Sequence, residues 1–315
     1  MPPPKSPIIF ANNPLDRAGH LRSKPDWLAQ QLASDTALFV PFWQLCPLIL
    51  PEIETGAGRD VGWLPRSAFG AALTPESLIV FLGINQRDKP LFAVDISAIS
   101  NPEDDSPFRG MGQFEDLRML ASAGDIAATE LAILAHAKAM LDWHLRHGFC
   151  ALCGAPSAPV EGGSKRVCTI CNGEHFPRTD PVVIMLATHG QDCLLGRQNG
   201  WPDNVFSALA GFMEPGETIA QAVARELHEE AGIDVSDVRI FADQPWPFPS
   251  QLMIGCLAKA ESRTIILGDD ELEEARWVSR NDIISALKGD GTIGLPPKMA
   301  IAHFLIKAFA ENNAV

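Results

Sequence analysis

The 315-residue sequence contains no tyrosine, so no phenolic hydroxyl is available for a hydrogen bond anywhere in the chain. It also lacks a membrane-spanning run of about 18 or more apolar residues. The most apolar stretch, "VPFWQLCPLILP", is short and is interrupted by prolines. The N-terminus "MPPPKSPIIF" has neither the long apolar core nor the cleavage site of a secretory signal. The lack of a membrane span and of a secretory signal predicts a cytoplasmic protein.

An excess of basic residues is missing as well. The formal net charge is −14, whereas binding along nucleic-acid backbones or acidic membranes requires a surplus of lysine and arginine. Broad binding of that kind is excluded, and a local basic patch stays open. The composition is 46% hydrophobic, which instead predicts a globular chain that is long enough for two or three domains.

A disulfide framework is also absent from the pattern of the seven cysteines. Four of them form two tight pairs, while Cys46, Cys193 and Cys256 are scattered among apolar neighbours. This usage fits a reducing compartment. The three scattered cysteines are predicted to be small core residues.

The chain divides into three predicted parts, with boundaries at residues 1–147, 148–176 and 177–315. In the first part, apolar runs at residues 77–84 and 91–97 flank a polar segment and predict a hairpin in an α+β domain. The second part holds the cysteine pairs. The third mixes short strands with helices, which predicts an α/β or α+β catalytic domain.

Two helices and a second hairpin are also expected. Leucines recur at helical spacing in residues 125–147, which predicts a long amphipathic helix, with Leu131, Leu134, Leu141 and Leu145 as its apolar stripe. Residues 180–198 contain two apolar runs around the turn "THGQD", and a last helix is expected near residues 298–310.

The motifs "CALC" and "CTIC" are separated by fourteen residues. A two-residue gap lets both thiolates of a pair reach one ion, and tetrahedral Zn²⁺ takes four such soft ligands. The pattern therefore favours zinc over the alternatives of two local disulfides or four unrelated thiols. Four protein ligands leave no open position, so the ion is expected to be structural and held by Cys150, Cys153, Cys168 and Cys171.

The segment "GFMEPGETIAQAVARELHEEAGI", residues 211–233, predicts a helix from Thr218 to Ala231 that is followed by Gly232 at its C-terminal cap. Glu226, Glu229 and Glu230 stand at positions i, i+3 and i+4 on one side of it. A solvated acidic face is the ordinary interpretation of such a helix. Three clustered carboxylates also suit a hard cation, Mg²⁺ or Mn²⁺.

The complete spacing decides between these interpretations. The segment satisfies G-x5-E-x7-R-E-U-x-E-E-x-G-U, where U is a bulky aliphatic residue. It therefore resembles the Nudix box of Nudix hydrolases. The resemblance implies an α/β/α sandwich and metal-dependent cleavage of a nucleoside diphosphate that is linked to another group. It further implies that Glu226 and Glu230 are metal ligands, that Glu229 is a ligand or base, and that the Ala210 carbonyl is a further ligand. Glu217 and Arg225 are implied to brace the loop.

Ten residues beyond the box, "DQPWPFPSQ" places three prolines between Gln, Trp and Phe. Such a backbone is stiff and presents flat apolar faces that suit a purine or nicotinamide ring. A proline-rich loop packing on its own domain is the alternative. After a Nudix box and a four-cysteine zinc ribbon, expected at residues 148–176, the segment resembles the signature of the NADH pyrophosphatase family of Nudix hydrolases.

This second resemblance implies a set of further site residues. It implies that Glu274 is a metal ligand or catalytic carboxylate from outside the box. The implied substrate contacts are Arg118, Phe176, Phe212, Gln244, Pro245, Trp246, Pro247, Phe248, Pro249, Ser250, Gln251 and the backbone of Ala302. Three positions depart from the family pattern, namely Phe176 in place of Tyr, Asp243 in place of Ser, and the order Ser250–Gln251. They affect the expected preference more than the reaction.

The sequence is thus interpreted as an NAD⁺ diphosphatase that hydrolyses NADH, or NAD⁺, to nicotinamide mononucleotide and AMP. The family resemblance implies a homodimer and allows the same chemistry on NAD-capped RNA 5′ ends. The alternative is a non-catalytic Nudix-like sensor, or a zinc-ribbon protein that binds nucleic acid. The intact carboxylate set argues against the sensor, and the ribbon has only Lys165 and Arg166 as nearby basic residues.

Overall fold

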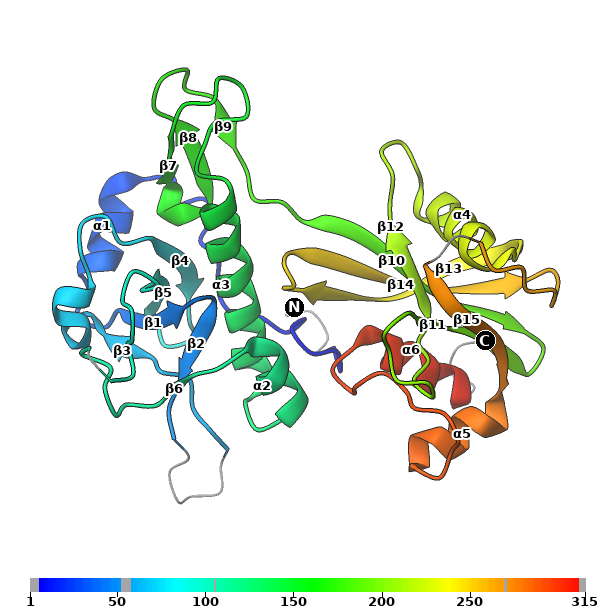
Figure 1. Ribbon diagram of the computed structural model, residues 1–315. Coiled ribbons are helices and arrows are strands. Elements are labelled where there is room, and N and C mark those ends of the chain that lie inside the picture. The colour runs from blue at the N-terminus through cyan, green and yellow to red at the C-terminus, as the bar shows by residue number, and fades with distance from the viewer. Residues whose placement is uncertain (1–5, 52–57, 105, 269–270, 312–315) are drawn as a thin grey trace. The chain divides into compact units, whose positions relative to one another are not determined.

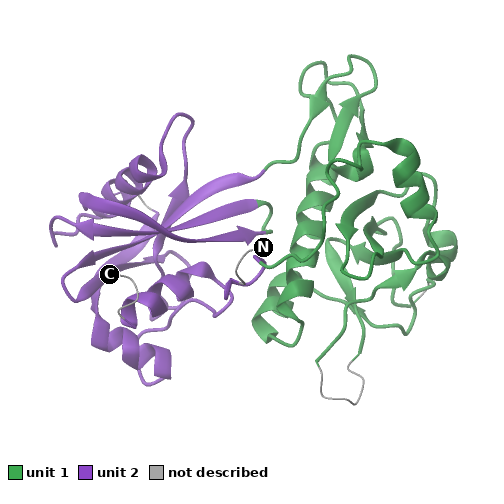
Figure 2. Cartoon of the chain, turned by 180° about the vertical axis from the view of Figure 1, so that it is seen from behind, with its two compact units in different colours: residues 1–5, 12–178, 247–250 green, residues 6–11, 179–246, 251–315 purple. Residues whose placement is uncertain are grey.

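The computed structural model describes residues 6–51, 58–104, 106–268 and 271–311 (Figure 1). The chain forms two compact units, which Figure 2 distinguishes by colour. The second unit consists of residues 6–11, 179–246 and 251–315, and the first contains residues 12–178 and 247–250. The ribbon belongs to the first unit, so the three-part boundaries expected from the sequence stay a prediction.

A mixed sheet forms the centre of the first unit. Its strand order is β4-β5-β1-β2-β6, with β3 beside β1. Strands β1 and β5 are parallel, and the hairpin β4–β5 that the sequence predicted is antiparallel, as expected. The strands are β1 (Leu38–Trp43), β2 (Cys46–Ile49), β3 (Leu64–Pro65), β4 (Ile79–Ile84), β5 (Pro90–Asp95) and β6 (Gln113–Phe114).

Helices α1 (Pro25–Ala33), α2 (Leu117–Ala123) and α3 (Ala128–Arg146) belong to the same unit, as do the 3₁₀ segments η1 (Arg66–Ala72) and η2 (Glu161–Gly163). The prediction of a long helix at α3 is confirmed, but the prediction that this helix is amphipathic is wrong. The helix is buried around most of its circumference, and Leu145, which was placed in the apolar stripe, is 53% exposed. Among the described residues no helix is both long and apolar enough to cross a bilayer.

The ribbon has a small antiparallel sheet of its own, β7 (Ser157–Val160), β8 (Lys165–Cys168) and β9 (Glu174–His175). Cys153 and Cys171 lie in turns beside these strands, while Cys168 is the last residue of β8.

A second mixed sheet builds the other unit, in the order β13-β14-β10-β11-β15, with β12 beside β10. Strands β10 and β14 run parallel, and the predicted β10–β11 hairpin is confirmed. The strands are β10 (Asp180–His189), β11 (Asp192–Gln198), β12 (Leu209–Phe212), β13 (Val235–Trp246), β14 (Gln251–Ala260) and β15 (Leu272–Ser279). The helices are α4 (Ile219–Ala231), α5 (Arg280–Lys288) and α6 (Ile301–Ala310).

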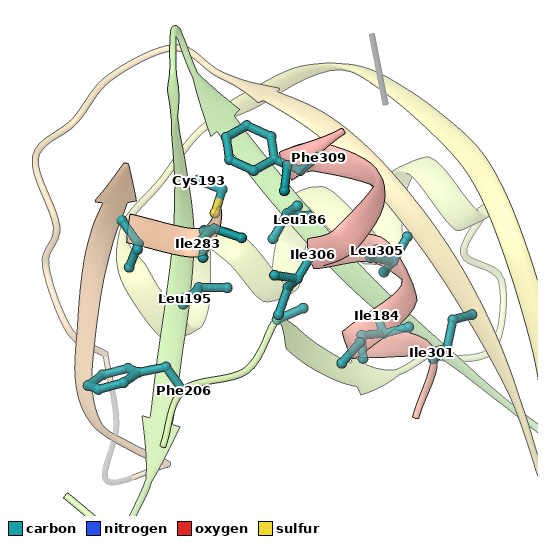
Figure 3. Packing of buried hydrophobic residues seen from close by; sticks show 14 of the residues in the cluster. Ile184, Leu186, Cys193, Leu195, Phe206, Ile283, Ile301, Leu305, Ile306 and Phe309 are labelled. Carbon is teal, nitrogen blue, oxygen red and sulfur yellow. The ribbon is translucent and has the colours of Figure 1, made fainter. Parts of the chain in front are cut away.

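Alternation along β10 explains why helices cover both faces of this sheet. Successive side chains of a strand point to opposite faces. Val183 and Met185 pack in the core that contains α4, whereas Ile184 and Leu186 pack in the core that contains α5 and α6. Figure 3 shows the latter core, with α6 residues such as Leu305 beside the strand. The expected α/β/α sandwich is confirmed.

Candidate active site

The glutamate helix begins and ends as its sequence predicts. The Thr218 side chain accepts from the Gln221 N–H, and the Gln221 side chain accepts from the Thr218 N–H, which makes a capping box. Gly232 closes the C-terminus in the left-handed conformation, at φ 66°. The ends of α4 are therefore fixed by local hydrogen bonds, and its carboxylates have defined directions.

Arg225 uses all five of its N–H donors inside the box. Its Nε and Nη2 donate to the two carboxylate oxygens of Glu217, at 2.6 and 3.0 Å. Its Nη1 donates to Glu226 and Glu229, both at 2.9 Å, and Nη2 also donates to the Phe212 carbonyl at 2.9 Å. The hydrogen bonds from Arg225 lower the pKa of Glu217 to about 2. Arg225 thus joins the loop before the helix to the helix itself.

Glu226 lies directly over the first glycine of the box. A Cβ at Gly211 would stand 1.9 Å from the Glu226 Cδ and about as close to both carboxylate oxygens. Only a glycine leaves room for this carboxyl group, which is buried. Burial raises the pKa of Glu226, and the hydrogen bond from Arg225 acts in the opposite direction.

Glu230 is the most buried carboxylate of helix α4. It is 6% exposed, and its Oε1 is buried without a hydrogen-bond partner among the described residues. Burial, followed by the negative charges of Glu271, Glu226 and Glu229, raises the pKa of Glu230 to about 8. A buried, unpartnered oxygen amid other carboxylates is a position where a cation would remove both costs.

Among the described residues outside the box, Glu271 is the acidic residue that acts on these groups. Its charge contributes to the raised pKa of both Glu226 and Glu230. Glu274, which the sequence favoured, is instead ion-paired with Arg276 at 2.7 Å and with Arg197 at 3.5 Å. It is placed there because β15 sets Glu274 opposite Arg197 in register.

The loop before β15 lies along the end of α4. The Ile266 N–H donates to the Ala231 carbonyl at 2.9 Å, and the Gly268 N–H donates to the Glu230 carbonyl at 3.3 Å. A Cβ at Gly268 would stand 1.8 Å from the Glu229 carbonyl oxygen, so a side chain there would push the loop away. Glu271 follows this contact by three residues, and the sequence offered no periodic signal for it.

The carboxylate oxygens of Glu226, Glu230 and Glu271 are hard donors and therefore fit a divalent cation such as Mg²⁺. The unpartnered Oε1 of Glu230 is one of these donors. They are not drawn together into a closed ligand set. Within the described ranges, the cysteines form the one group of His, Cys, Asp or Glu with ligand atoms all within 4.8 Å. Glu229 points instead to Arg225, and its side chain is 58% exposed.

The four cysteines meet at one point, as the sequence predicted. The Sγ atoms of Cys150 and Cys171 are 3.6 Å apart, and those of Cys153 and Cys168 are 3.5 Å apart. Four sulfurs at about 2.3 Å from a tetrahedral Zn²⁺ are separated by roughly 3.8 Å. Backbone N–H groups of Cys171 and Ile170 lower the pKa of Cys168 to about 6, which favours the thiolate that a metal binds. The cluster fits a structural zinc ion.

Lys165 and Arg166, the two basic residues of the ribbon, are both engaged by other side chains of the same unit. Lys165 pairs with Glu161 at 2.8 Å and with Glu174 at 2.7 Å. Arg166 is buried, and it donates to the Ser157 hydroxyl at 2.8 Å and to the His144 Nδ1 on α3 at 2.9 Å. Neither side chain is therefore directed to a nucleic acid, and Arg166 fastens the ribbon to α3.

The "QPWPFP" segment forms the end of the β13–β14 hairpin, where Trp246 pairs with Gln251. Gln244 within it is fully buried. Its Nε2 donates to the Met299 carbonyl at 2.8 Å and to the Ile9 carbonyl at 3.1 Å, and its Oε1 accepts from the Ile301 N–H at 2.8 Å. The expected substrate contact by this side chain is not supported, because Gln244 fastens β13 to the start of α6.

The two aromatic residues of the segment have different surroundings. Trp246 packs edge-on against Phe10, with ring centroids 6.2 Å apart. Phe248 lies under the Arg118 guanidinium, 4.4 Å from ring centroid to Cζ. Pro247 is buried and Pro245 is exposed, while Pro249, Ser250 and Gln251 are half-buried. The segment thus has several packing roles within the protein.

The remaining expected residues are spread over several elements. Ala210 and Phe212 lie on β12 beside Gly211, and Phe212 is 55% exposed. Phe176 follows β9 and is 63% exposed, whereas Ala302 is buried in the first turn of α6. Both phenylalanine rings are accessible for stacking.

Comparisons with known proteins cover all three parts of the chain. Residues 36–143 match the family described as "NADH pyrophosphatase-like rudimentary NUDIX domain", residues 145–176 match "NADH pyrophosphatase zinc ribbon domain", and residues 176–295 match "NUDIX domain". The chain belongs to the NADH pyrophosphatase family of Nudix hydrolases. The rudimentary Nudix domain was missed in the sequence because it carries no box. Its sheet nevertheless contains a parallel pair, β1 and β5, as the Nudix sheet does in β10 and β14.

Individual proteins that are similar to this one align with most of the chain. The Homo sapiens "NAD-capped RNA hydrolase NUDT12" is 34% identical over 96% of this chain and 73% of its own length. The Schizosaccharomyces pombe "NAD-capped RNA hydrolase" is 34% identical over 97% of this chain and 93% of its own. The Homo sapiens "NAD(P)H pyrophosphatase NUDT13, mitochondrial" is 36% identical over 92% of this chain and 89% of its own.

Proposed function

We propose that this Nudix hydrolase cleaves the diphosphate of NADH and NAD⁺, yielding nicotinamide mononucleotide, reduced or oxidised, and AMP. The same cleavage at an NAD-capped RNA 5′ end would release nicotinamide mononucleotide and leave a 5′-monophosphate on the RNA. The observation that carries the proposal is the buried, unpartnered Oε1 of Glu230 among Glu226, Glu229 and Glu271. The relatives named for NAD-capped RNA and NAD(P)H support the choice of dinucleotide.

The substrate is an anion, and the acidic site would repel it without a counter-charge. Bound Mg²⁺ or Mn²⁺ would supply that counter-charge and stabilise charge that develops on the phosphoryl oxygens. We assign Glu226, Glu230 and Glu271 as the side chains that hold the cations, with the Ala210 carbonyl beside them on β12. The charge of Glu271 on Glu226 and Glu230 supports this set over one that includes Glu274.

Water is the nucleophile in the proposed reaction. Its oxygen forms a bond to one phosphorus of the diphosphate, while the bond from that phosphorus to the bridging oxygen breaks. The water loses a proton, and we assign its acceptance to Glu229, whose side chain is 58% exposed and can return the proton to solvent. Arg225 holds Glu229 and Glu226 at 2.9 Å and so keeps them in place before the substrate arrives.

Phe212 and Phe176 are exposed rings that suit stacking on the adenine or nicotinamide ring. Phe176 stacks without the hydroxyl of a tyrosine, so any hydrogen bond from that position is lost. We further assign a structural zinc ion to the ribbon. The family resemblance implies a homodimer, and the cysteine usage fits the reducing environment of the cytoplasm.

A substrate panel tests the function. NADH, NAD⁺, ADP-ribose, diadenosine polyphosphates, FAD and NAD-capped RNA are each incubated with Mg²⁺, with Mn²⁺ and with EDTA, and products are separated by chromatography. We expect equimolar nicotinamide mononucleotide and AMP from the NAD substrates with either metal, and none in EDTA. Glu230→Gln from the same preparation controls for contaminating hydrolases. If no dinucleotide is cleaved with either metal, the proposal is wrong.

A further inference from the structure

Residues 6–11 belong to the second compact unit, together with residues 179–246 and 251–315. Within it, Ile8 lies in the core that contains α5 and α6, and it is 6% exposed. Phe10 is also buried. The segment is thus built into the Nudix unit, although it is far from the other residues of that unit along the sequence.

The segment contains a turn with an unusual residue in it. The Ala11 N–H donates to the Ile8 carbonyl at 3.4 Å, and Phe10, the third residue of this turn, has a φ of 72°. Glycine or asparagine is the usual residue at such a position, because a positive φ strains a residue with a bulky side chain. A conformation of this kind persists only where surrounding contacts determine it. The contacts of Phe10 and of its neighbour Ile9 therefore explain the turn.

The first of these contacts is a hydrogen bond from Gln244 to Ile9. The Gln244 side chain is fully buried, and its Nε2 carries two N–H groups. They donate to the Met299 carbonyl at 2.8 Å and to the Ile9 carbonyl at 3.1 Å. Loss of the Ile9 carbonyl would leave one buried N–H unpaired, which destabilises a protein. This carbonyl belongs to the central peptide bond of the turn, so the turn sets its direction towards Gln244.

The second contact joins the rings of Phe10 and Trp246. Their centroids are 6.2 Å apart and their planes are inclined at 72°, the edge-to-face arrangement that aromatic pairs favour. Trp246 is the last residue of β13 and is half-buried. Gln244 and Trp246 are two residues apart on this strand, so their side chains project to the same face of the sheet. Residues 6–11 therefore hold both side chains on one face of β13.

We propose that residues 6–11 position the end of β13 for substrate binding, with Phe10 acting through Trp246 and the Ile9 carbonyl acting through Gln244. Phe10 is a positioning residue and does not touch the substrate. The proposal rests on the proposed function, since the family resemblance places Trp246 in the substrate site. The competing interpretation is that Phe10 only fills volume in the core.

Four variants separate these interpretations. Phe10→Gly removes the ring and suits a positive φ, so the turn and the Ile9 carbonyl stay in place. Trp246→Leu removes the partner ring, and a double variant combines the two changes. Ile306→Ala is the matched control, because it removes buried volume from the same core at a position on α6. Each full-length protein is measured by its melting temperature, by hydrogen exchange of a peptide that covers residues 241–246, and by KM and kcat for NADH.

We expect exchange of this peptide to rise by about 2- to 10-fold in Phe10→Gly, the range that loss of an aromatic pair implies. KM should rise by a similar factor while kcat stays within about twofold, because a displaced site weakens ground-state and transition-state binding equally. In Trp246→Leu protein, the added Phe10→Gly change should have little further effect, since the shared contact is already lost. Ile306→Ala should lower the melting temperature and leave KM and the exchange of the peptide close to the wild type.

Unchanged exchange in Phe10→Gly would overturn the contact with β13. The positioning role would be wrong if KM stayed unchanged in Phe10→Gly, if it rose equally in Ile306→Ala, or if the two changes were additive in the double variant. If the wild type does not hydrolyse NADH, the proposed function fails, and exchange in Phe10→Gly and the double variant still decides whether Phe10 holds Trp246.

Discussion

The carboxyl group of Glu226 occupies the space where a Cβ of residue 211 would stand, with its Cδ only 1.9 Å from that position. The first glycine of the box is thus explained by a carboxylate fifteen residues later in the chain. Loop and helix are fitted to each other at this point, and Arg225 also holds the same two segments together, through Glu217 and the Phe212 carbonyl.

Gly211→Ala should therefore displace Glu226. Forcing a methyl group into occupied space costs about 1–3 kcal/mol in the free energy of unfolding, and it moves a proposed metal ligand. We expect a lower midpoint in urea denaturation together with a loss of NADH hydrolysis. Gly19→Ala is the matched control, because no atom lies within 4 Å of its Cβ position. Equal midpoints for Gly211→Ala and the wild type would contradict the contact.

Glu271→Gln and Glu274→Gln should differ in their effect on turnover. Glu271 acts electrostatically on Glu230 and Glu226, whereas Glu274 is paired with Arg276 at 2.7 Å. We expect kcat to fall by about 10²-fold or more for Glu271→Gln, and by much less for Glu274→Gln. Initial rates at saturating NADH and Mg²⁺ measure both. A larger fall in kcat for Glu274→Gln than for Glu271→Gln would instead support Glu274 as the metal ligand or catalytic carboxylate, as the sequence suggested.

Arg225→Lys should lower kcat/KM about 10- to 100-fold, the usual effect of losing a residue that orients metal ligands. A lysine has one charged nitrogen and cannot make the five hydrogen bonds that join Arg225 to Glu217, Glu226, Glu229 and the Phe212 carbonyl. Arg239→Lys is the control, since Arg239 is 55% exposed and its ion pair with Asp237 is long, at 3.6 Å. Full activity of Arg225→Lys would show that the brace is dispensable.

Stability in EDTA should fall as pH rises from about 6.5 to 8, through Glu230, because below about 6.5 the pKa values of His136 and His144, which desolvation lowers, act in the opposite direction. The pKa of Glu230 is raised from 4.5 in the unfolded chain to about 8 in the folded protein, so the folded state binds more protons in this window. Stability then decreases with pH. Glu217, with a pKa of about 2, contributes only below about 4.5. Urea midpoints at several pH values should decline for the wild type and decline less for Glu230→Gln. Parallel curves would refute the assignment.

Cys150→Ser should release zinc and unfold the ribbon, because a four-ligand site supplies folding free energy. We expect about one equivalent of zinc in the wild type and much less in Cys150→Ser, measured with a chromogenic chelator after denaturation. The melting temperature should fall as well. Cys46→Ser, outside the cluster and half-buried, should retain its zinc, and so should Glu230→Gln. Normal zinc content in Cys150→Ser would argue against a four-cysteine site.

The sequence by itself determined the elements whose signals are local. Capping at Thr218 and Gly232, the β10–β11 hairpin around "THGQD", and the two cysteine pairs depend on residues a few positions apart, and all were found as predicted. Motif spacing also placed Glu226, Glu229 and Glu230 on one helix.

Only the tertiary structure decided which distant residues share a site. The loop at Gly268 lies against the end of α4, and this contact brings Glu271 near the helix. The register of β15 places Glu274 opposite Arg197 instead. Gln244 is buried by hydrogen bonds to residues far along the chain, and Phe248 is engaged by cations more than a hundred residues away. Such contacts depend on how strands and loops pack, and no spacing within the sequence records them.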